Sequence, residues 1–133
     1  MKKIFQLLLL IFFSNILVSC DPSRHISFVN KTDSDVKIKI NLVPKVKDFG
    51  LYEKAINDSI VYNLKKNDLA TIYCGIGTWT NDQTTKFANS VNTIEIDTKD
   101  TKTIYKSKKA IKNILDKNIK GILVKSLLEI KIE

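Results

Sequence analysis

The chain has 133 residues, of which 44% are hydrophobic, and a formal net charge of +8. This length suits one domain with a buried core and is short for two. Arg24 is the only arginine, whereas proteins that read nucleic acids depend on the planar fork of arginine side chains. We therefore expect no nucleic-acid partner. We interpret the charge as a solvated surface, with attraction to anionic lipids or polyanionic sugars as the alternative.

The N-terminus has the order of features found in secretory signals. Lys2 and Lys3 precede an apolar run over residues 4–18, and the small residue Ser19 follows it. Charge, apolar run and small residue at a cleavage point are typical of an exported protein. The apolar run is shorter than the roughly 20 residues that span a bilayer. This argues against a retained transmembrane anchor.

The segment Leu17-Val18-Ser19-Cys20 resembles the lipobox of bacterial lipoproteins, in which a signal peptidase cuts just before a cysteine that carries lipid. The resemblance implies cleavage between Ser19 and Cys20 and two or three acyl chains on Cys20. A thiolate is the nucleophile that such acylation needs, and two or more chains make anchoring durable. The alternatives are an ordinary signal peptide, in which Cys20 is incidental, and an uncleaved anchor.

The resemblance also implies a location and a division of the chain. Residues 1–19 would be the cleaved leader, residues 20–25 a short lipidated tether, and residues 26–133 a single β-rich domain close to the bilayer of a bacterial cell envelope. Asp21 resembles the signal that keeps enterobacterial lipoproteins on the inner membrane. Because that rule differs between bacterial groups, the inner and outer membranes both stay open, and so does the oligomeric state.

Three pairs of segments alternate between apolar and polar residues, which is the period of a half-buried strand. Each pair is separated by a short polar stretch, so we predict three β-hairpins. In the first, Ile38, Ile40 and Leu42 face the core. The predicted pairs are residues 26–30 with 36–42, 60–64 with 69–74, and 92–97 with 102–105.

The remaining segments carry weaker signals. Residues 44–50 are predicted to be a loop, and residues 52–56 are either a helical turn or an edge strand. Gly75 and Gly77 should break the strand before them, and residues 80–89 are the most loop-like part of the domain.

The spacing of apolar residues becomes helical after Ser107, which is a predicted N-cap. Gly121 is the predicted stop of this amphipathic helix. Residues 122–132 then alternate as a long strand, which we place inside the sheet. The prediction is a mainly β domain of about seven strands with one late helix, as an antiparallel β-sandwich or as one sheet backed by the helix. The predicted core comprises Phe28, Ile38, Ile40, Ile72, Ile94, Ile96, Ile114, Val124, Leu128 and Ile130.

The inventory of catalytic groups is small. His25, the only histidine, lies in the predicted tether, so catalytic triads and histidine-based metal sites are not expected. Cys74 has no partner once Cys20 is acylated. It lies in an apolar run, which favours burial over a reactive thiol. We predict no catalytic residue, no metal and no cofactor.

Two kinds of residue remain as site candidates. The pairs Asp33–Asp35 and Asp97–Asp100 could in principle support glycosidic chemistry. Aspartate is common in turns for a structural reason, however, because its side chain bonds nearby backbone amides. Trp79 is an aromatic residue in a polar neighbourhood, which is typical of a sugar or protein contact. The alternative, which we favour, is that Trp79 folds back and caps the core.

These observations lead to three hypotheses for the function. The first is a non-enzymatic, membrane-anchored envelope lipoprotein that binds a protein or a glycan. The second is an immunity-type or inhibitor lipoprotein that neutralises a toxin or hydrolase. The third is an enzyme that uses carboxylates alone. Beyond residue 21 the chain resembles only in general character the small β-rich lipoproteins of Gram-negative bacteria, and that likeness transfers no functional residue.

Overall fold

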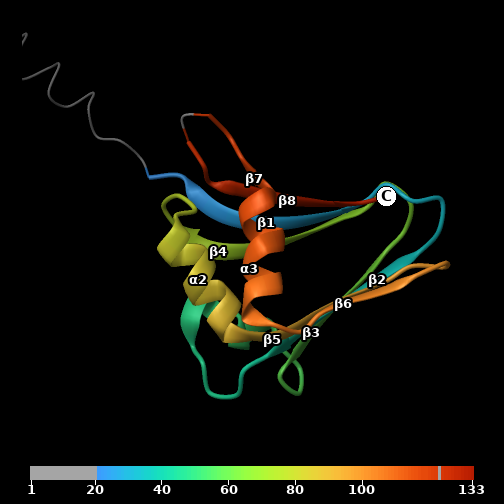
Figure 1. Ribbon diagram of the computed structural model, residues 1–133, viewed down its shortest axis with the longest axis horizontal. Coiled ribbons are helices and arrows are strands. Elements are labelled where there is room, and N and C mark those ends of the chain that lie inside the picture. The colour runs from blue at the N-terminus through green and yellow to red at the C-terminus, as the bar shows by residue number, and fades with distance from the viewer. Residues whose placement is uncertain (1–20, 123) are drawn as a thin grey trace, which may run out of the picture.

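The computed structural model describes residues 21–122 and 124–133 of the chain (Figure 1). The predicted cleavage after Ser19 and the predicted lipidation of Cys20 lie outside the described residues. The described part contains eight strands, two α-helices and two short 3-10 turns. In chain order these are β1 (Ser23–Asn30), β2 (Val36–Leu42), η1 (Asp48–Gly50), η2 (Tyr52–Lys54), β3 (Ser59–Leu64), β4 (Leu69–Ile76), α2 (Asn81–Ser90), β5 (Val91–Asp97), β6 (Lys102–Tyr105), α3 (Lys108–Lys117), β7 (Ile119–Lys120) and β8 (Leu127–Ile132).

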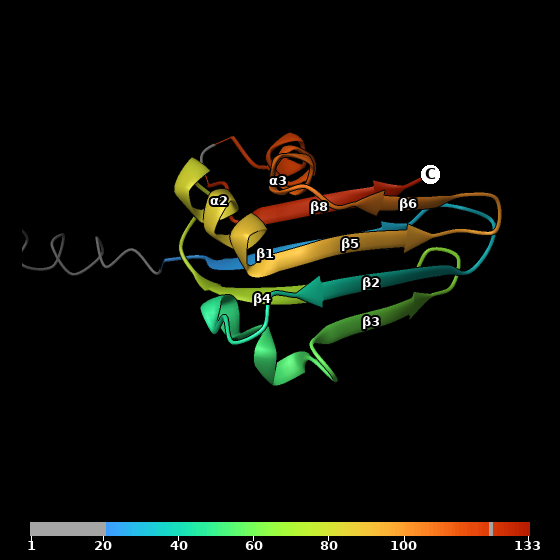
Figure 2. The same cartoon turned by 60° about the horizontal axis from the view of Figure 1, so that its bottom comes forward.

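The strands form two four-stranded sheets, in the orders β4-β1-β8-β7 and β3-β2-β5-β6. All neighbours are antiparallel except β1 and β8, which run parallel. Buried side chains from both sheets and both helices make one hydrophobic cluster. Helix α3 contacts β5 of one sheet and β8 of the other, so it spans an open side between them (Figures 1 and 2). The fold is therefore mainly β and sandwich-like, as predicted.

The first predicted hairpin is wrong, although both of its strands are present. Strand β1 pairs with β4 and β8, whereas β2 pairs with β3 and β5 in the other sheet. The polar residues 31–35 thus carry the chain from one sheet to the other. Val36, Ile38 and Ile40 are buried as alternation predicts. The apolar faces of β1 and β2 meet across the core, which satisfies the same sequence pattern as a hairpin would.

The second predicted hairpin is wrong for the same reason. Strands β3 and β4 lie in different sheets, and residues 65–68 connect them. Asn67 adopts a positive φ of 64°, which asparagine tolerates better than most residues. The carboxylate of Asp68 accepts a hydrogen bond from the Lys65 amide at 3.0 Å. A compact polar turn is therefore compatible with crossing the sandwich as well as with reversing within a sheet.

The third predicted hairpin is confirmed, and so is the start of the late helix. Strands β5 and β6 pair antiparallel across residues 98–101. Ser107 caps α3 by accepting a hydrogen bond from the Ala110 amide at 3.1 Å. The predicted end at Gly121 is wrong, because α3 ends at Lys117 and Asn118 is its C-cap. The Asn118 side-chain amide donates to the Ile114 carbonyl at 2.7 Å, which satisfies one carbonyl of the last turn.

Residues 80–89, predicted to be a loop, belong instead to the start and body of α2. The Thr80 hydroxyl accepts a hydrogen bond from the Gln83 amide at 3.3 Å and caps the helix. Thr84 and Phe87 are buried and lie three residues apart, so they share one face of the helix. Helix α2 packs against α3. A helix that is stabilised by the packing of one narrow face needs few apolar residues. The segment is therefore mostly polar, and this composition suggested a loop.

The C-terminal segment is divided where the sequence predicted one long strand. Residues 119–120 form β7, and the next strand, β8, begins only at Leu127. Gly121 has a φ of +105° in the turn between them. Ile122 is 95% exposed and Val124 is 50% exposed, so the prediction that Val124 belongs to the core is wrong. Strand β8 does lie inside its sheet, between β1 and β7, as predicted.

The other core predictions and the tether can be compared residue by residue. The predicted core residues are buried, apart from Val124 and the partly buried Ile114. Residues 52–56, for which two structures were predicted, contain the 3-10 turn η2. Strand β1 begins at Ser23, so residues 23–25 belong to the sheet and not to the predicted tether.

Candidate functional site

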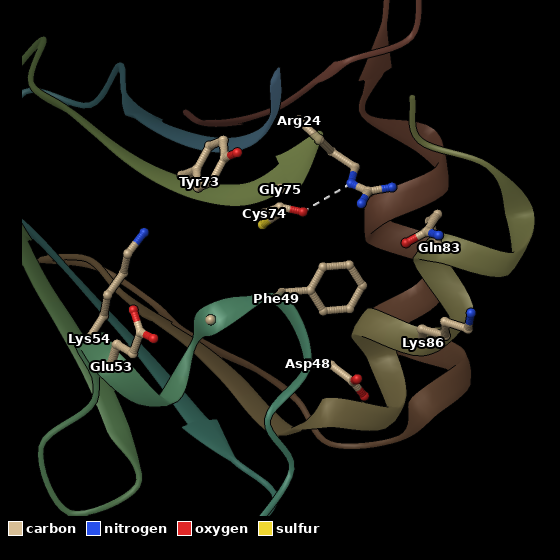
Figure 3. A pocket seen from close by; sticks show the side chains of 11 residues that line it. Arg24, Asp48, Phe49, Glu53, Lys54, Tyr73, Cys74, Gly75, Gln83 and Lys86 are labelled. Atoms are coloured by element: carbon tan, nitrogen blue, oxygen red, sulfur yellow. Dashed lines mark hydrogen bonds between the residues drawn. The ribbon is translucent and has the colours of Figure 1, made fainter. Parts of the chain in front are cut away.

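A pocket of about 510 Å³ lies at the end of the sandwich where β1 begins. This volume is within the range of roughly 300–1,000 Å³ that is usual for small-molecule sites. Its walls come from the start of β1, the 3-10 turns η1 and η2, the end of β4 and one side of α2 (Figure 3). The lining residues are Arg24, Asp48, Phe49, Gly50, Glu53, Lys54, Tyr73, Cys74, Gly75, Gln83 and Lys86.

Arg24 is the most unusual residue of this pocket, because it is buried, with only 8% of the residue exposed. Its Nε donates to the Cys74 carbonyl at 3.1 Å, and its Nη1 donates to the Thr78 carbonyl at 3.2 Å. Both acceptors are neutral. Among the described residues, no carboxylate forms an ion pair with the guanidinium. Arg24 therefore brings an uncompensated positive charge to the wall of the pocket.

Two aromatic rings partly stabilise this charge. The guanidinium carbon of Arg24 lies 5.6 Å from the ring centroid of Phe49 and 5.3 Å from that of Trp79. Both distances are short enough for a cation–π interaction. The two rings are stacked with centroids 6.2 Å apart, and Phe87 packs against both. The aromatic group holds the guanidinium in place without neutralising it.

Phe49 is held in a strained backbone conformation, with a φ of +60°. A bulky residue rarely adopts a positive φ, and such strain costs on the order of 1–3 kcal/mol and is found most often at functional sites. The strain places the phenyl ring between Arg24 and the acidic residue Asp48 (Figure 3). The neighbouring Gly50 also has a positive φ, of 61°.

The rim of the pocket carries charges of both signs. Lys86 on α2 pairs with Asp82 at 3.1 Å, whereas Lys54 on η2 forms no ion pair within the described residues. Asp48 and Glu53 contribute carboxylates. Ser90 donates its hydroxyl to the carboxylate of Asp48 at 3.4 Å. The pocket is thus suited to a ligand that has both an anionic and a cationic group.

Cys74 contributes to the wall as a neutral thiol. It is buried, as predicted, and its Sγ lies 3.6 Å from the Ile72 carbonyl, to which the thiol donates. Burial raises the pKa of the Cys74 thiol to about 12, although the positive charges of Lys54 and Arg24 act in the opposite direction. Since the thiolate is the nucleophilic form of cysteine, this side chain supplies shape to the pocket and no reactivity near neutral pH.

Trp79, the predicted ligand contact, is only 2% exposed. Its indole Nε1 donates to the His25 carbonyl at 3.0 Å. The indole therefore belongs to the core cluster, which agrees with the interpretation that it caps the core. A ring buried to this degree does not protrude from a loop toward a ligand. It acts on the pocket through Arg24 instead.

The predicted aspartate pairs lie away from the pocket, at the opposite end of the sandwich: Asp33, Asp35 and Asp100 are in connections there, and Asp97 is the last residue of β5 (Figure 2). Asp33 forms an exposed ion pair with Lys66, and a hydrogen bond from that lysine lowers the pKa of the Asp33 carboxyl. No group of three or more histidine, cysteine, aspartate or glutamate side chains is placed to hold a metal in the part of the chain that the structure describes.

Sequence reasoning did not identify Arg24 and Phe49. A signal for Arg24 was present, because it continues the period of two set by Ile26, Phe28 and Asn30, all of which are buried. An arginine on the buried face of a strand indicates a special role for its charge. The backbone conformation of Phe49 has no comparable signal in the sequence.

Comparison with protein-family models, curated proteins and solved structures found no match to this chain. Neither helix of the described residues has the length and apolar character required to cross a membrane.

Proposed function

We propose that this protein is a lipid-anchored protein of the bacterial cell envelope, and that its β-sandwich is a non-enzymatic binding module held close to the membrane surface. The observation that carries the proposal is the distance along the chain between the lipobox and the fold. Only Asp21 and Pro22 separate Cys20 from the first residue of β1. A lipid on Cys20 would therefore bring one end of the sandwich to the bilayer.

The first strand leaves little freedom at this junction. The Pro22 carbonyl accepts a hydrogen bond from the Gly77 amide at 2.8 Å, so the chain is tied to the end of β4 one residue before β1. An extended chain covers at most about 3.6 Å per residue. The two residues from Cys20 to Pro22 thus allow the lipidated residue to lie only a short way from the sandwich.

The pocket supports the assignment as a binding module. It is lined by Arg24 at the start of β1 and combines this buried cation with charged groups on the rim. Its one cysteine has a raised thiol pKa, and the only histidine, His25, packs against Tyr73 with the two rings tilted by 57°. These are properties of a site that holds a ligand by shape and charge.

The test is to express the full chain and the Cys20→Ala variant in a bacterial host and to compare intact mass and membrane fractionation. We expect the unaltered protein to lose residues 1–19, to gain the mass of acyl chains and to stay with the membrane. The variant should lack the acyl mass. A soluble product without acyl chains from the unaltered chain would refute the anchor.

A further inference from the structure

We propose that the Arg24 pocket binds a phosphate diester that also carries an ammonium group, as an ethanolamine headgroup does. The inference rests on the proposed function for the source of this ligand, which is the lipid of the membrane beside the pocket. The chemistry of the ligand is argued from the residues of the pocket alone.

The first step is that the guanidinium of Arg24 has N–H groups that donate to no residue of the described chain. An arginine has five N–H groups, and the described residues accept from Nε and Nη1 of Arg24 only. On the side of Nη2 the chain has Gly75, where an added Cβ would lie 3.6 Å from this nitrogen. Gly75 has a φ of +88°, a conformation that disfavours any other residue. The missing side chain therefore leaves Nη2 open to the pocket.

The second step is that the guanidinium lacks an anion. A buried charge is costly unless it is paired, and Arg24 has only carbonyls and aromatic rings around it. Two parallel donors of a guanidinium match two oxygens of a phosphate. Lys54 on the rim adds a second positive charge without an ion-pair partner among the described residues. A phosphate bound here would complete the electrostatics of the site.

The third step concerns the carboxylates of the pocket. Asp48 lies beyond the ring of Phe49 as seen from Arg24, and Glu53 comes from η2 on another side of the pocket, next to Lys54 (Figure 3). Carboxylates in these positions repel a purely anionic ligand and attract a cationic group. An ammonium joined to the phosphate by a short linker meets both requirements. A headgroup that ends in hydroxyls would meet only the first.

The experiment uses the full chain purified from its bacterial host in dodecyl maltoside, a detergent without phosphate. Two soluble probes are titrated by calorimetry, glycerophosphoethanolamine and glycerophosphoglycerol, which share the phosphate diester and differ in the ammonium group. Emission of Trp79, the only tryptophan, is recorded in parallel because its ring lies 5.3 Å from the guanidinium carbon. We expect saturable binding of the ethanolamine probe, a change in Trp79 emission at the same concentrations, and weaker binding of the glycerol probe.

Three variants separate the parts of the site. Arg24→Lys keeps the charge and loses the fork, so affinity should fall about tenfold, which is typical for a lost charge-assisted hydrogen bond. Glu53→Gln changes an exposed side chain and should remove the preference for the ethanolamine probe. Lys99→Glu, at the opposite end of the sandwich, is the charge control and should change neither the affinity nor the preference for the ethanolamine probe. Thermal melting confirms that each variant is folded.

The proposal is overturned if neither probe binds saturably, if binding leaves Trp79 emission unchanged, or if the glycerol probe binds as tightly as the ethanolamine probe. An equal loss of affinity in Lys99→Glu would also overturn it. Binding of the soluble probes does not depend on an acyl chain. The probes can therefore bind even if the intact mass shows no acylation of Cys20, and they can fail to bind even if the intact mass shows it.

Vesicles distinguish the two sources of the ligand. The protein is reconstituted in digalactosyldiacylglycerol, which has no phosphate, with or without phosphatidylethanolamine. If lipid fills the pocket, the soluble ethanolamine probe should change Trp79 emission only in vesicles without phosphatidylethanolamine. An equal response in both vesicles would retain the site and assign it to a soluble phosphate diester. No response in either vesicle would count against the site.

Discussion

A single buried amide, that of Asn30, holds the two connections between the sheets together. Its Nδ2 donates to the Ser34 carbonyl at 2.7 Å and to the Leu64 carbonyl at 3.1 Å. Its Oδ1 accepts from the amide of Thr32 at 2.9 Å. The backbone of Asn30 also bonds to the second connection, through the Asn67 amide and the Asp68 carbonyl. Asn30 is completely buried, so no water replaces these bonds.

Asn30→Ala should therefore lower the free energy of unfolding by about 1–3 kcal/mol, the usual cost of leaving buried polar groups without partners. Urea denaturation followed by circular dichroism measures the loss. Asn63→Ala, on the exposed side of β3, is the matched control and should change stability little. Equal losses in the two variants would show that the Asn30 amide is not the group that secures the connections.

The thiol of Cys74 gives a second prediction at the scale of one residue. Its pKa of about 12 in the folded protein lies well above the usual thiol value of 9.0, mainly because of burial. At pH 8.5 iodoacetamide should leave Cys74 unmodified in the native protein and should alkylate it in urea. Peptide mass spectrometry reads the modification. Rapid native labelling would mean that the thiol is exposed and ionised.

The raised pKa also has a consequence for stability. The thiol of the unfolded chain ionises first as the pH rises above 9, while the folded thiol stays protonated until about pH 12. The unfolded state therefore binds fewer protons in this window, and Cys74 makes stability fall as the pH rises. Cys74→Ala should show a shallower loss of stability between pH 9 and 12 than the unaltered protein, measured by urea denaturation.

At the scale of the element, β8 is central to its sheet, with β1 on one side and β7 on the other. Leu128 is completely buried and Ile130 is 3% exposed. Truncation of either residue to alanine removes buried methyl groups and leaves a cavity, so each should cost about 2–5 kcal/mol. Val124→Ala is the control, because this side chain is half exposed. Chemical denaturation that shows a loss below about 0.5 kcal/mol for both core variants would make β8 peripheral.

The elements also show what the sequence can and cannot predict. Alternation identified the strands and their buried faces, as in β2, because the period of two depends only on which side of the strand is covered. It did not predict partners, because β1 and β2 bury the same faces whether they lie side by side or across the core. Only the connections between the strands distinguish the two arrangements. The buried amide of Asn30 secures these connections, but it was not recognisable in a polar segment of the sequence.

The same limit applies to the candidate site. Arg24 occupies an inward position of β1, and this position is readable from the sequence once the strand is extended to Ser23. Phe49 and Gly75 come to the pocket from distant parts of the chain. Their positions depend on how η1 packs against β4, which is a property of the assembled sandwich and has no local pattern.

At the scale of the whole molecule, the two ends of the sandwich differ. One end has the compact polar connections 31–35, 65–68 and 98–101 (Figure 2). The other has the start of β1, the pocket and the turn before β8, where Lys125 and Ser126 accept backbone hydrogen bonds from Trp79 and His25. Ile122 in this turn is 95% exposed. An exposed aliphatic side chain between Lys120 and Lys125 is compatible with contact between this end and a bilayer.

With the anchor that we propose on Cys20, the protein should stand with the pocket end at the membrane, and environment-sensitive dyes can test this orientation. A nitrobenzoxadiazole label is placed on Ile122→Cys or on Asp100→Cys, at opposite ends of the sandwich; burial protects Cys74 from the reagent. In phosphatidylcholine vesicles the label at position 122 should emit at a shorter wavelength than it does in water, because it enters the less polar interface between the lipid headgroups and the acyl chains. The label at 100 should emit as it does in water. Equal emission from the two positions would show that the sandwich has no fixed orientation on the bilayer, and a blue shift at 100 alone would reverse it.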